Sequence, residues 1–107
     1  MTFNLLLWKW SDDYDTPAKR KKHKIKFGDI TGQFAQTADH PAIGSADIAG
    51  FVRALDEEFG ADEDRRPFVL ERHSRTAVIN YLNAVRLDLV PRVAAVGRRF
   101  GLNASEF

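Results

Sequence analysis

"PFVLERHSRTAVINY", residues 67–81, is the stretch of sequence that decides the fold. It contains two runs rich in β-branched and aromatic residues, 67–73 and 75–81, which meet at Ser74 and Arg75. Runs of this composition favour β-strands, and so short a break between them favours a tight antiparallel hairpin. The stretch therefore predicts two neighbouring strands of an antiparallel sheet.

An amphipathic helix is expected directly before this hairpin, over "SADIAGFVRALDEEFG", residues 45–60. Its apolar residues recur at helical spacing, Ser45 is a suitable N-cap, and Gly60 is a suitable end. The helix is followed by an acidic loop that leads into the first strand of the hairpin.

A second helix is expected after the hairpin, from Pro91 to a C-cap at Gly101, because Val93, Val96 and Phe100 recur on one face. Residues 83–90 fit two structures. Their alternation of apolar and charged residues favours a strand, whereas a helix could also begin near residue 83 and carry Pro91 near its start. Residues 102–107 are expected to form a short edge strand or a tail.

The chain opens with "TFNLLLWKW", residues 2–10, a nearly continuous apolar run that is typical of a central strand. Thr16 and Pro17 then suit the N-cap and first position of a helix whose solvent face is "AKRKKHK". A short helix over 29–36 and a loop over 37–44 complete the prediction.

This order of elements predicts a single α+β domain over residues 1–107. We expect an antiparallel sheet with helices packed on one face, in the split βαβ order of ferredoxin-like folds. The length of 107 residues suits one core. The longest apolar run is too short to span a bilayer, and the chain has no cysteine. A cytoplasmic protein without membrane attachment is therefore expected.

Charge is segregated along the chain although the net charge is only +1. All lysines lie at or before Lys26, and the densest basic block is residues 19–26. Two acidic patches carry the opposite charge. "SDDYD" at 11–15 lies just before the basic block, and "DEEFGADED" at 56–64 lies farther along the chain. The surface is therefore expected to be dipolar.

No recognisable catalytic or cofactor motif is present. His23, His40 and His73 are far apart and have no zinc-ligand spacing, and glycine-rich phosphate loops are missing. His73 and Ser74 would point to opposite faces of a strand, which makes them a poor base and nucleophile. We therefore expect a protein that is not an enzyme and that holds no metal and no cofactor.

The basic block suggests nucleic-acid binding as one alternative function. Lysines at this density neutralise phosphates without reading bases, and the aromatic residues that flank them can stack on bases. Trp8 and Trp10 share strand parity and could instead both face the core. The candidate nucleic-acid contacts are Lys19, Arg20, Lys21, Lys22, Lys24 and Lys26.

Three longer stretches carry a resemblance: residues 40–60, residues 65–81 and "VPRVAAVGRRFGLN" at 90–103, together with the opening "LLLWKW". This pattern resembles small bacterial immunity proteins that are encoded beside polymorphic toxins, including those of contact-dependent growth inhibition. The resemblance implies a cytoplasmic protein that forms a heterodimer with its cognate toxin domain. Such a toxin is commonly a nuclease that cleaves tRNA or DNA, and the immunity protein blocks its active site or substrate surface.

Carboxylates are the groups that would face the basic groove of a nuclease. Both acidic patches are candidates, and a tyrosine beside them would suit an anchor of the kind enriched in interfaces. The near-neutral charge of the whole chain departs from the strong acidity of many nuclease inhibitors. The candidate partner contacts are Asp12, Asp13, Tyr14, Asp15, Asp62, Glu63 and Asp64.

Overall fold

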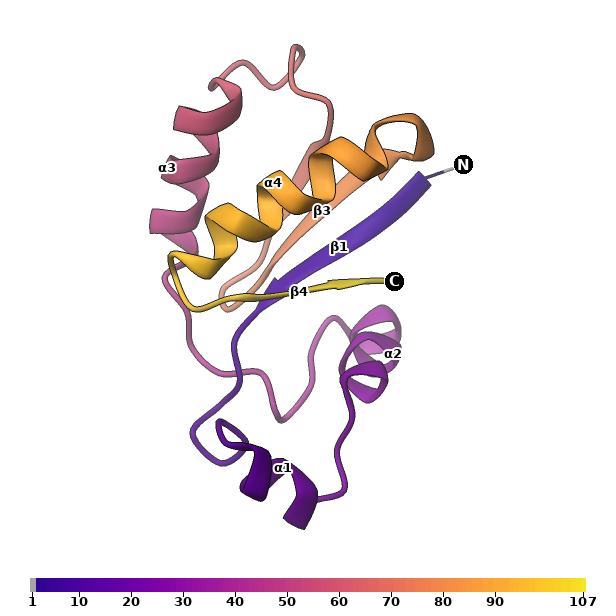
Figure 1. Cartoon of the computed structure of the whole chain (residues 1–107), viewed down its shortest axis with the longest axis vertical. Helices are drawn as coiled ribbons and strands as arrows, with labels where there is room; N and C mark the ends of the chain where they lie inside the picture. The colour runs from indigo at the N-terminus through magenta and orange to yellow at the C-terminus, as the bar shows by residue number, and fades with distance from the viewer. Residues whose placement is uncertain (1) are drawn as a thin grey trace.

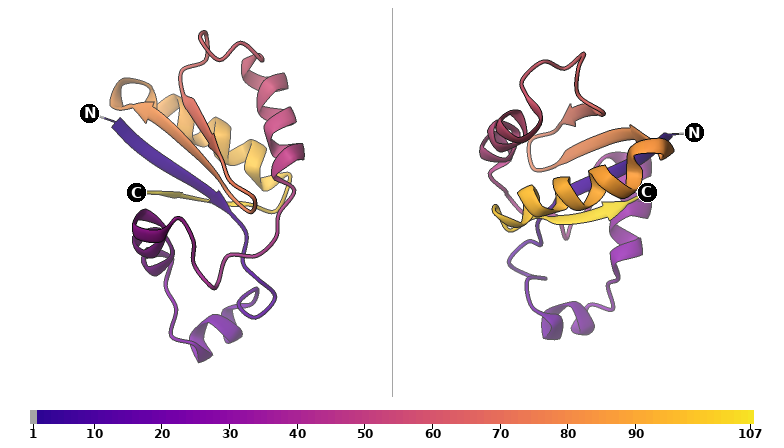
Figure 2. Two further views of the ribbon diagram at one scale, coloured as in Figure 1. Left: turned by 180° about the vertical axis from the view of Figure 1, so that it is seen from behind. Right: turned by 45° about the horizontal axis from the view of Figure 1, so that its top comes forward.

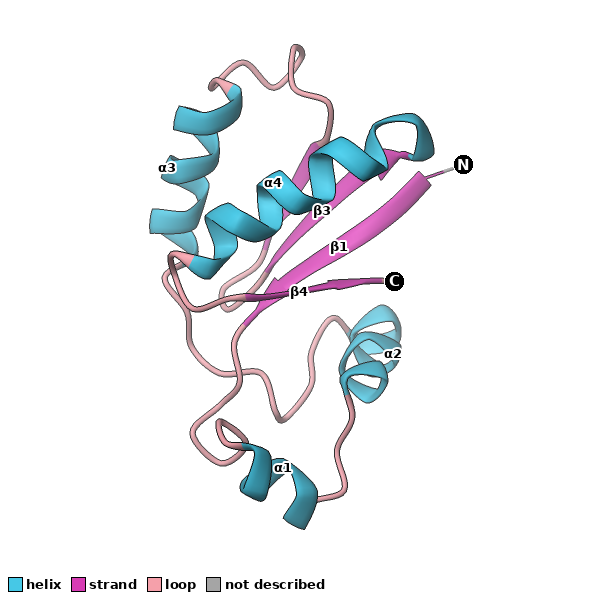
Figure 3. Cartoon of the chain, in the orientation of Figure 1, coloured by secondary structure: helices cyan, strands magenta, loops and turns pink. Residues whose placement is uncertain are grey.

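Four strands form one antiparallel sheet in the order β2–β3–β1–β4 (Figure 3). The structure is a computed structural model and describes residues 2–107. Its elements in chain order are β1 (Thr2–Trp8), α1 (Pro17–Lys22), α2 (Phe27–Thr37), α3 (Ile48–Phe59), β2 (Val69–Arg72), β3 (Ala77–Leu82), a 3₁₀ turn η1 (Asn83–Val85), α4 (Arg86–Arg98) and β4 (Asn103–Glu106).

The opening strand β1 lies inside the sheet, between β3 and β4, as its apolar run predicts. Successive side chains of a strand point to opposite faces. Leu5 and Leu7 belong to one apolar cluster, and Leu6 and Trp8 belong to another. All four side chains are buried, so β1 is covered on both faces.

The helices α3 and α4 cover the first of these faces (Figure 1). Phe51 and Leu55 of α3 and Leu89 and Val93 of α4 are buried there against Leu5 and the other inward residues of the sheet. The helix α3 lies between β1 and β2 in the chain, and α4 lies between β3 and β4. The α+β class, the antiparallel sheet and the ferredoxin-like order are thus confirmed.

Residues 9–46, which we call the inserted segment, add a second layer that extends the predicted architecture. Ile30 and Phe34 of α2, together with Ile43, pack with Leu6 and Trp8 on the face opposite to α3 and α4 (Figure 2). One face therefore carries α3 and α4, as predicted, and the other carries α2.

The inserted segment returns to the end of β1 through a close backbone contact. Trp10 and Ile43 form an isolated antiparallel bridge, and the Gly44 N–H donates to the Lys9 carbonyl at 2.7 Å. A Cβ atom at Gly44 would lie only 2.7 Å from the Ser11 Cα atom. Only glycine allows the two backbone stretches to approach this closely.

The ambiguous residues 83–90 form η1 and the first part of α4, so the strand alternative is wrong. The alternation misleads because Leu87 is 90% exposed, whereas Leu89 is buried at helical spacing from Val93. Pro91 lies inside α4. The carbonyl that Pro91 leaves without an intrahelical donor is that of Leu87, where the exposed position lets water bind it.

Several boundaries differ from those predicted. Asp47, and not Ser45, caps α3, because its Oδ1 accepts a hydrogen bond from the Gly50 N–H at 2.9 Å. Gly60 ends α3 with a φ of 85°, as predicted. The hairpin turns at Ser74 and Arg75, as predicted, and the His73 N–H donates to the Thr76 carbonyl at 3.0 Å. The Thr16 cap of α1 and the C-terminal edge strand β4 are confirmed.

Candidate functional site

The second acidic patch forms one end of the molecule, which we call the acidic end and define as residues 56–66. After α3 the chain makes a turn in which the Arg65 N–H donates to the Asp62 carbonyl at 3.1 Å. The Asp62 carboxylate accepts the Asp64 N–H at 3.1 Å and pairs with Arg65 at 3.3 Å. Its charge is therefore partly used within the loop, whereas the Glu63 side chain remains 84% exposed.

A buried arginine organises this end. The Arg66 side chain is only 3% exposed, its Nη1 donates to the Asp56 carboxylate at 2.9 Å, and its Nη2 lies 3.7 Å from Glu63. The guanidinium also lies over the Phe68 ring at 5.0 Å from the centroid. Sequence reasoning missed Arg66, although an arginine one residue beyond an acidic run and directly before "PF" is a usable signal for an inward-folded cation.

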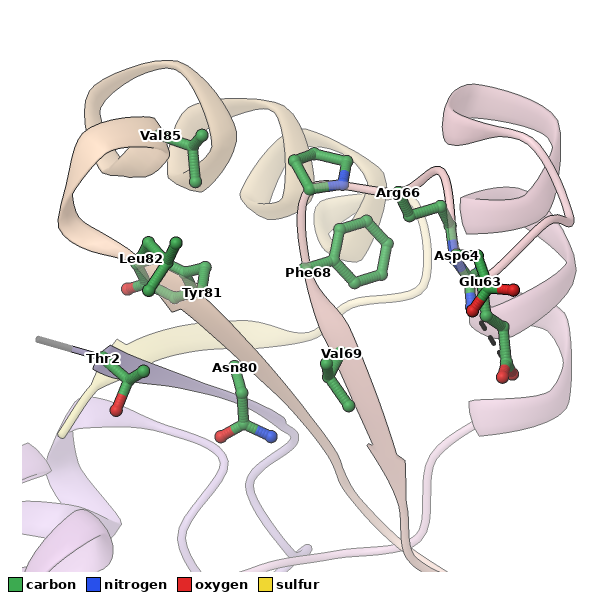
Figure 4. A pocket seen from close by; sticks show the side chains of 11 residues that line it. Thr2, Glu63, Asp64, Arg66, Phe68, Val69, Asn80, Tyr81, Leu82 and Val85 are labelled. Atoms are coloured by element: carbon green, nitrogen blue, oxygen red, sulfur yellow. Dashed lines mark ion pairs between the residues drawn. The ribbon is translucent and has the colours of Figure 1, made fainter.

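An apolar hollow of about 460 Å³ lies beside the acidic end, where β2 begins (Figure 4). The hollow forms because the two strands end at different points. β2 begins at Val69, which pairs with Asn80, whereas β3 continues to Leu82, and Arg66 and Pro67 lead away from the sheet. Val69 and Leu82 line it and are 66% and 57% exposed. Glu63 and Asp64 stand at its rim. Sequence reasoning did not find this hollow.

Tyr81 forms one wall of the hollow and is held by a polar cluster. Its hydroxyl donates to the Glu106 Oε2 at 2.6 Å, and the same carboxylate receives the Arg86 Nε at 2.8 Å. Burial, followed by the Glu106 hydrogen bond, raises the pKa of Tyr81 strongly. The hydrogen bond from Arg86, followed by that from Tyr81, lowers the pKa of Glu106. The phenol therefore stays protonated and the carboxylate stays charged near neutral pH.

The first acidic patch lies elsewhere, where β1 leads into α1. Lys19 neutralises part of it, because its Nζ donates to the Asp15 carboxylate at 3.0 Å and to the Asp12 carbonyl at 2.7 Å. Asp12 and Asp13 line a polar hollow that Lys9 and Arg75 share. Within residues 2–107 only Asp15 of this patch has an ion-pair partner, whereas Asp12 and Asp13 share a hollow with cations but form no ion pair.

Tyr14, which we predicted as a partner contact, is half-buried, and its ring lies 4.9 Å from the His23 ring. Its carbonyl accepts a hydrogen bond from the Arg20 Nη1 at 2.9 Å. The Arg20 guanidinium also lies 4.8 Å from the Trp10 ring centroid. Tyr14 therefore helps to hold α1 in place.

These contacts divide the basic block, residues 19–26. We call residues 11–27, which contain this block and the first acidic patch, the basic end. Lys19 and Arg20 turn toward the protein. The other four lysines are exposed and have no ion-pair partner among residues 2–107; these are Lys21, Lys22, Lys24 and Lys26.

The two predicted acidic patches do not meet. Figure 1 shows α1 and the loop after α3 at opposite ends of the long axis, and the molecule extends 44 Å along that axis. A standard protein interface takes about 800 Å² from each partner, which is a patch roughly 30 Å across. One such interface cannot contain both patches.

Within residues 2–107 no three histidine, cysteine or carboxylate side chains gather as metal ligands. No helix in the same range has the length and apolarity needed to cross a bilayer. Comparisons with protein-family models, with curated proteins and with solved structures find no match to this chain.

Proposed function

We propose that this chain is an immunity protein that binds a cognate bacterial toxin domain in the cytoplasm and neutralises it without catalysis of its own. The toxin class that we propose is a nuclease, such as a tRNase, whose active site or substrate surface would be covered. The observation that carries this proposal is the apolar hollow beside exposed carboxylates at the free edge of the sheet.

The hollow combines the features of a protein-docking site. Its exposed apolar side chains, Val69 and Leu82, supply area that gains free energy when water is removed. Glu63 and Asp64 at its rim supply negative charge, which attracts the cationic surface that a nuclease uses for phosphates. An apolar centre with a charged rim is the usual arrangement of an interface that is both stable and selective.

The edge strand β2 gives the partner a second means of attachment. It pairs with β3 on one side only, so its other side has backbone N–H and C=O groups that a partner strand can bond. The hollow begins at Val69, the first residue of this strand. A toxin segment that enters the hollow would therefore also meet a free strand edge.

The structure favours one of the two predicted acidic patches for this role. Asp15 is paired with Lys19, and the hollow that Asp12 and Asp13 line is polar and is shared with Lys9 and Arg75. Glu63 and Asp64 line the apolar hollow, and Asp62 precedes them in the same loop. We therefore assign the partner surface to the acidic end.

The test is co-expression with the product of the neighbouring upstream gene, followed by a toxicity assay and by measurement of the binding affinity. We expect Leu82→Asp to weaken binding by about 30-fold or more, since it places a charge in the apolar centre of the contact and loses about 2 kcal/mol. Leu82 is exposed, so the free energy of unfolding of the variant should change little.

Leu87→Asp is the matched control, because Leu87 is an exposed leucine that does not line the hollow. This variant should bind like the wild type. If the unmodified chain neither forms a complex nor protects against the toxin, the proposed function is overturned. Equal losses from Leu82→Asp and Leu87→Asp would overturn only the assignment of the hollow.

A further inference from the structure

We infer that the basic end is a second binding site, which takes single-stranded nucleic acid, and that it is independent of the toxin-binding surface. The four unpaired lysines named above are the charged part of this site. They lie along one short stretch, which can follow a sugar–phosphate backbone. Lys19 and Arg20, by contrast, are used within the fold and are not part of it.

An exposed aromatic ring stands next to these lysines. Phe27 directly follows Lys26 and is 53% exposed, although it is a large apolar side chain. Its ring is held edge-on against Trp10, with 5.4 Å between ring centroids, and against Trp8 at 5.8 Å. Phe27 is therefore a fixed platform, and a base can stack on the part of the ring that faces water.

The arginine behind this platform stiffens it further. Arg20 lies over the Trp10 ring at 4.8 Å and donates to the Tyr14 carbonyl, and these contacts connect α1 to the aromatic group. The helix α1 buries no side chain of its own. A six-residue helix that contributes nothing to the core and presents unpaired lysines is better explained by what it presents than by packing.

Lys24 supports the same conclusion through its backbone. Its φ of 56° lies in the left-handed region, where glycine or asparagine is the favourable choice. A lysine at this position loses conformational free energy but adds a cation between α1 and Phe27. A conformational cost of this kind is expected at a position where a positive charge serves binding.

The partner chemistry follows from the combination of charge and ring. Lysines alone would bind any polyanion, including duplex DNA, whereas a fixed exposed ring adds affinity only for unpaired bases. Four lysines attract an anionic membrane by only about 1 kcal/mol each, and stable attachment would need apolar side chains that insert as well. Among the exposed large apolar residues of 2–107, only Phe27 lies within the inserted segment that carries the basic end.

The experiment titrates the full chain into a fluorescein-labelled twelve-nucleotide oligo(dT) or oligo(U) and follows anisotropy at 50 and 200 mM salt. With four lysines on phosphates, the affinity should fall about 50-fold between these salt concentrations, from a slope of roughly 0.7 per phosphate for single strands. Trp10 lies beside the platform, so tryptophan fluorescence should be quenched on binding.

Lys21→Glu combined with Lys22→Glu should weaken binding at least 10-fold. Arg98→Glu combined with Arg99→Glu is the matched control, since these adjacent cations are also exposed but lie at the end of α4. Lys24→Gly should weaken binding about 3-fold, because it removes a cation, while its unfolding midpoint stays the same or rises. Phe27→Leu should weaken single-strand binding about 5-fold and leave duplex binding unchanged.

The inference is overturned by three results: no oligonucleotide binding at 50 mM salt, equal losses from the Lys21/Lys22 and Arg98/Arg99 pairs, or binding only to vesicles that contain phosphatidylserine. Equal affinity for duplex and single strand, with no effect of Phe27→Leu, would overturn the stacking platform. Toxin neutralisation by the Lys21/Lys22 variant should remain intact, so failure here and failure of the proposed function are separate outcomes.

Discussion

The acidic end and the basic end are each organised by an arginine that lies over an aromatic ring and leaves groups of mainly one sign exposed. At the acidic end Arg66 lies over Phe68, bonds Asp56 and is 3% exposed, while Glu63 points outward. At the basic end Arg20 lies over Trp10, bonds a carbonyl and is half-buried, while four lysines point outward. The two ends differ in how deeply the arginine is buried.

This difference reflects what lies behind each arginine. Arg66 is placed between α3 and the start of β2, so it is enclosed by the core. Arg20 lies on the inserted segment, which rests on the sheet through one smaller apolar cluster. The charged side chains of the acidic end are therefore held in place by the main core. Those of the basic end are held only by contacts within the inserted segment and its smaller apolar cluster.

The largest expected effect compares the two arginines directly. Arg66→Ala should lower the free energy of unfolding by about 3 kcal/mol, because it removes packing on Phe68 and leaves Asp56 without its partner. Arg20→Ala should lower it by about 1 kcal/mol, the value of one hydrogen bond and a half-buried cation–π contact. Urea denaturation measures both. Equal losses would show that the two ends are supported alike.

The next effect concerns the attachment of the inserted segment. Gly44→Ala should lower the free energy of unfolding by about 2 kcal/mol, since the new Cβ would lie 2.7 Å from the Ser11 Cα and 2.8 Å from the Trp10 carbonyl oxygen. Hydrogen exchange should show that amides of α2 lose protection before those of β1 and β3.

Gly32→Ala is the matched control for this variant. Gly32 lies inside α2, where a Cβ would meet nothing within 4 Å. Alanine is the better helix former, so this variant should gain about 1 kcal/mol. A loss from Gly32→Ala, or uniform loss of protection throughout the molecule in Gly44→Ala, would contradict the view that the inserted segment is a separately attached layer.

Local patterns in the sequence predicted the elements well, and for physical reasons. The continuous apolar run of β1 reflects burial on both faces, and the caps at Thr16 and Gly60 satisfy backbone groups within a few residues. The strand alternative for 83–90 failed because the alternation included Leu87, which is exposed and carries no information on burial.

The candidate site was harder to predict because it depends on distances between parts of the chain that are far apart. The sequence shows two acidic patches but not that they lie at opposite ends of the molecule. It also does not show which cations fold inward, because Lys19 and Lys21 are chemically identical and differ only in the partners that the fold gives them. The hollow at Val69 and Leu82 arises from strands of unequal length, which no local pattern reports.

The smallest expected effect is a pH dependence confined to the inserted segment. His40 is buried there, and its Nδ1 accepts the Ala42 N–H at 2.9 Å, which places the ring proton on Nε2. Burial lowers the pKa of His40, although Asp29 and Asp39 act in the opposite direction. A histidine whose pKa is lower in the folded state adds stability that is fully present above its unfolded pKa of about 6.5. That stability is lost as the pH falls through the folded value.

Between pH 7.5 and 5 the inserted segment should therefore weaken by up to about 1 kcal/mol, the value of the hydrogen bond that a protonated Nδ1 cannot accept. The sheet should hold in this range, because Arg86 lowers the pKa of Glu106 below 4.5 and its contribution is lost only in stronger acid. His40→Asn keeps an acceptor near the Ala42 N–H but does not titrate, so hydrogen exchange in α2 should lose this pH dependence. If the variant keeps the full pH dependence, a group other than His40 makes the inserted segment sensitive to acid.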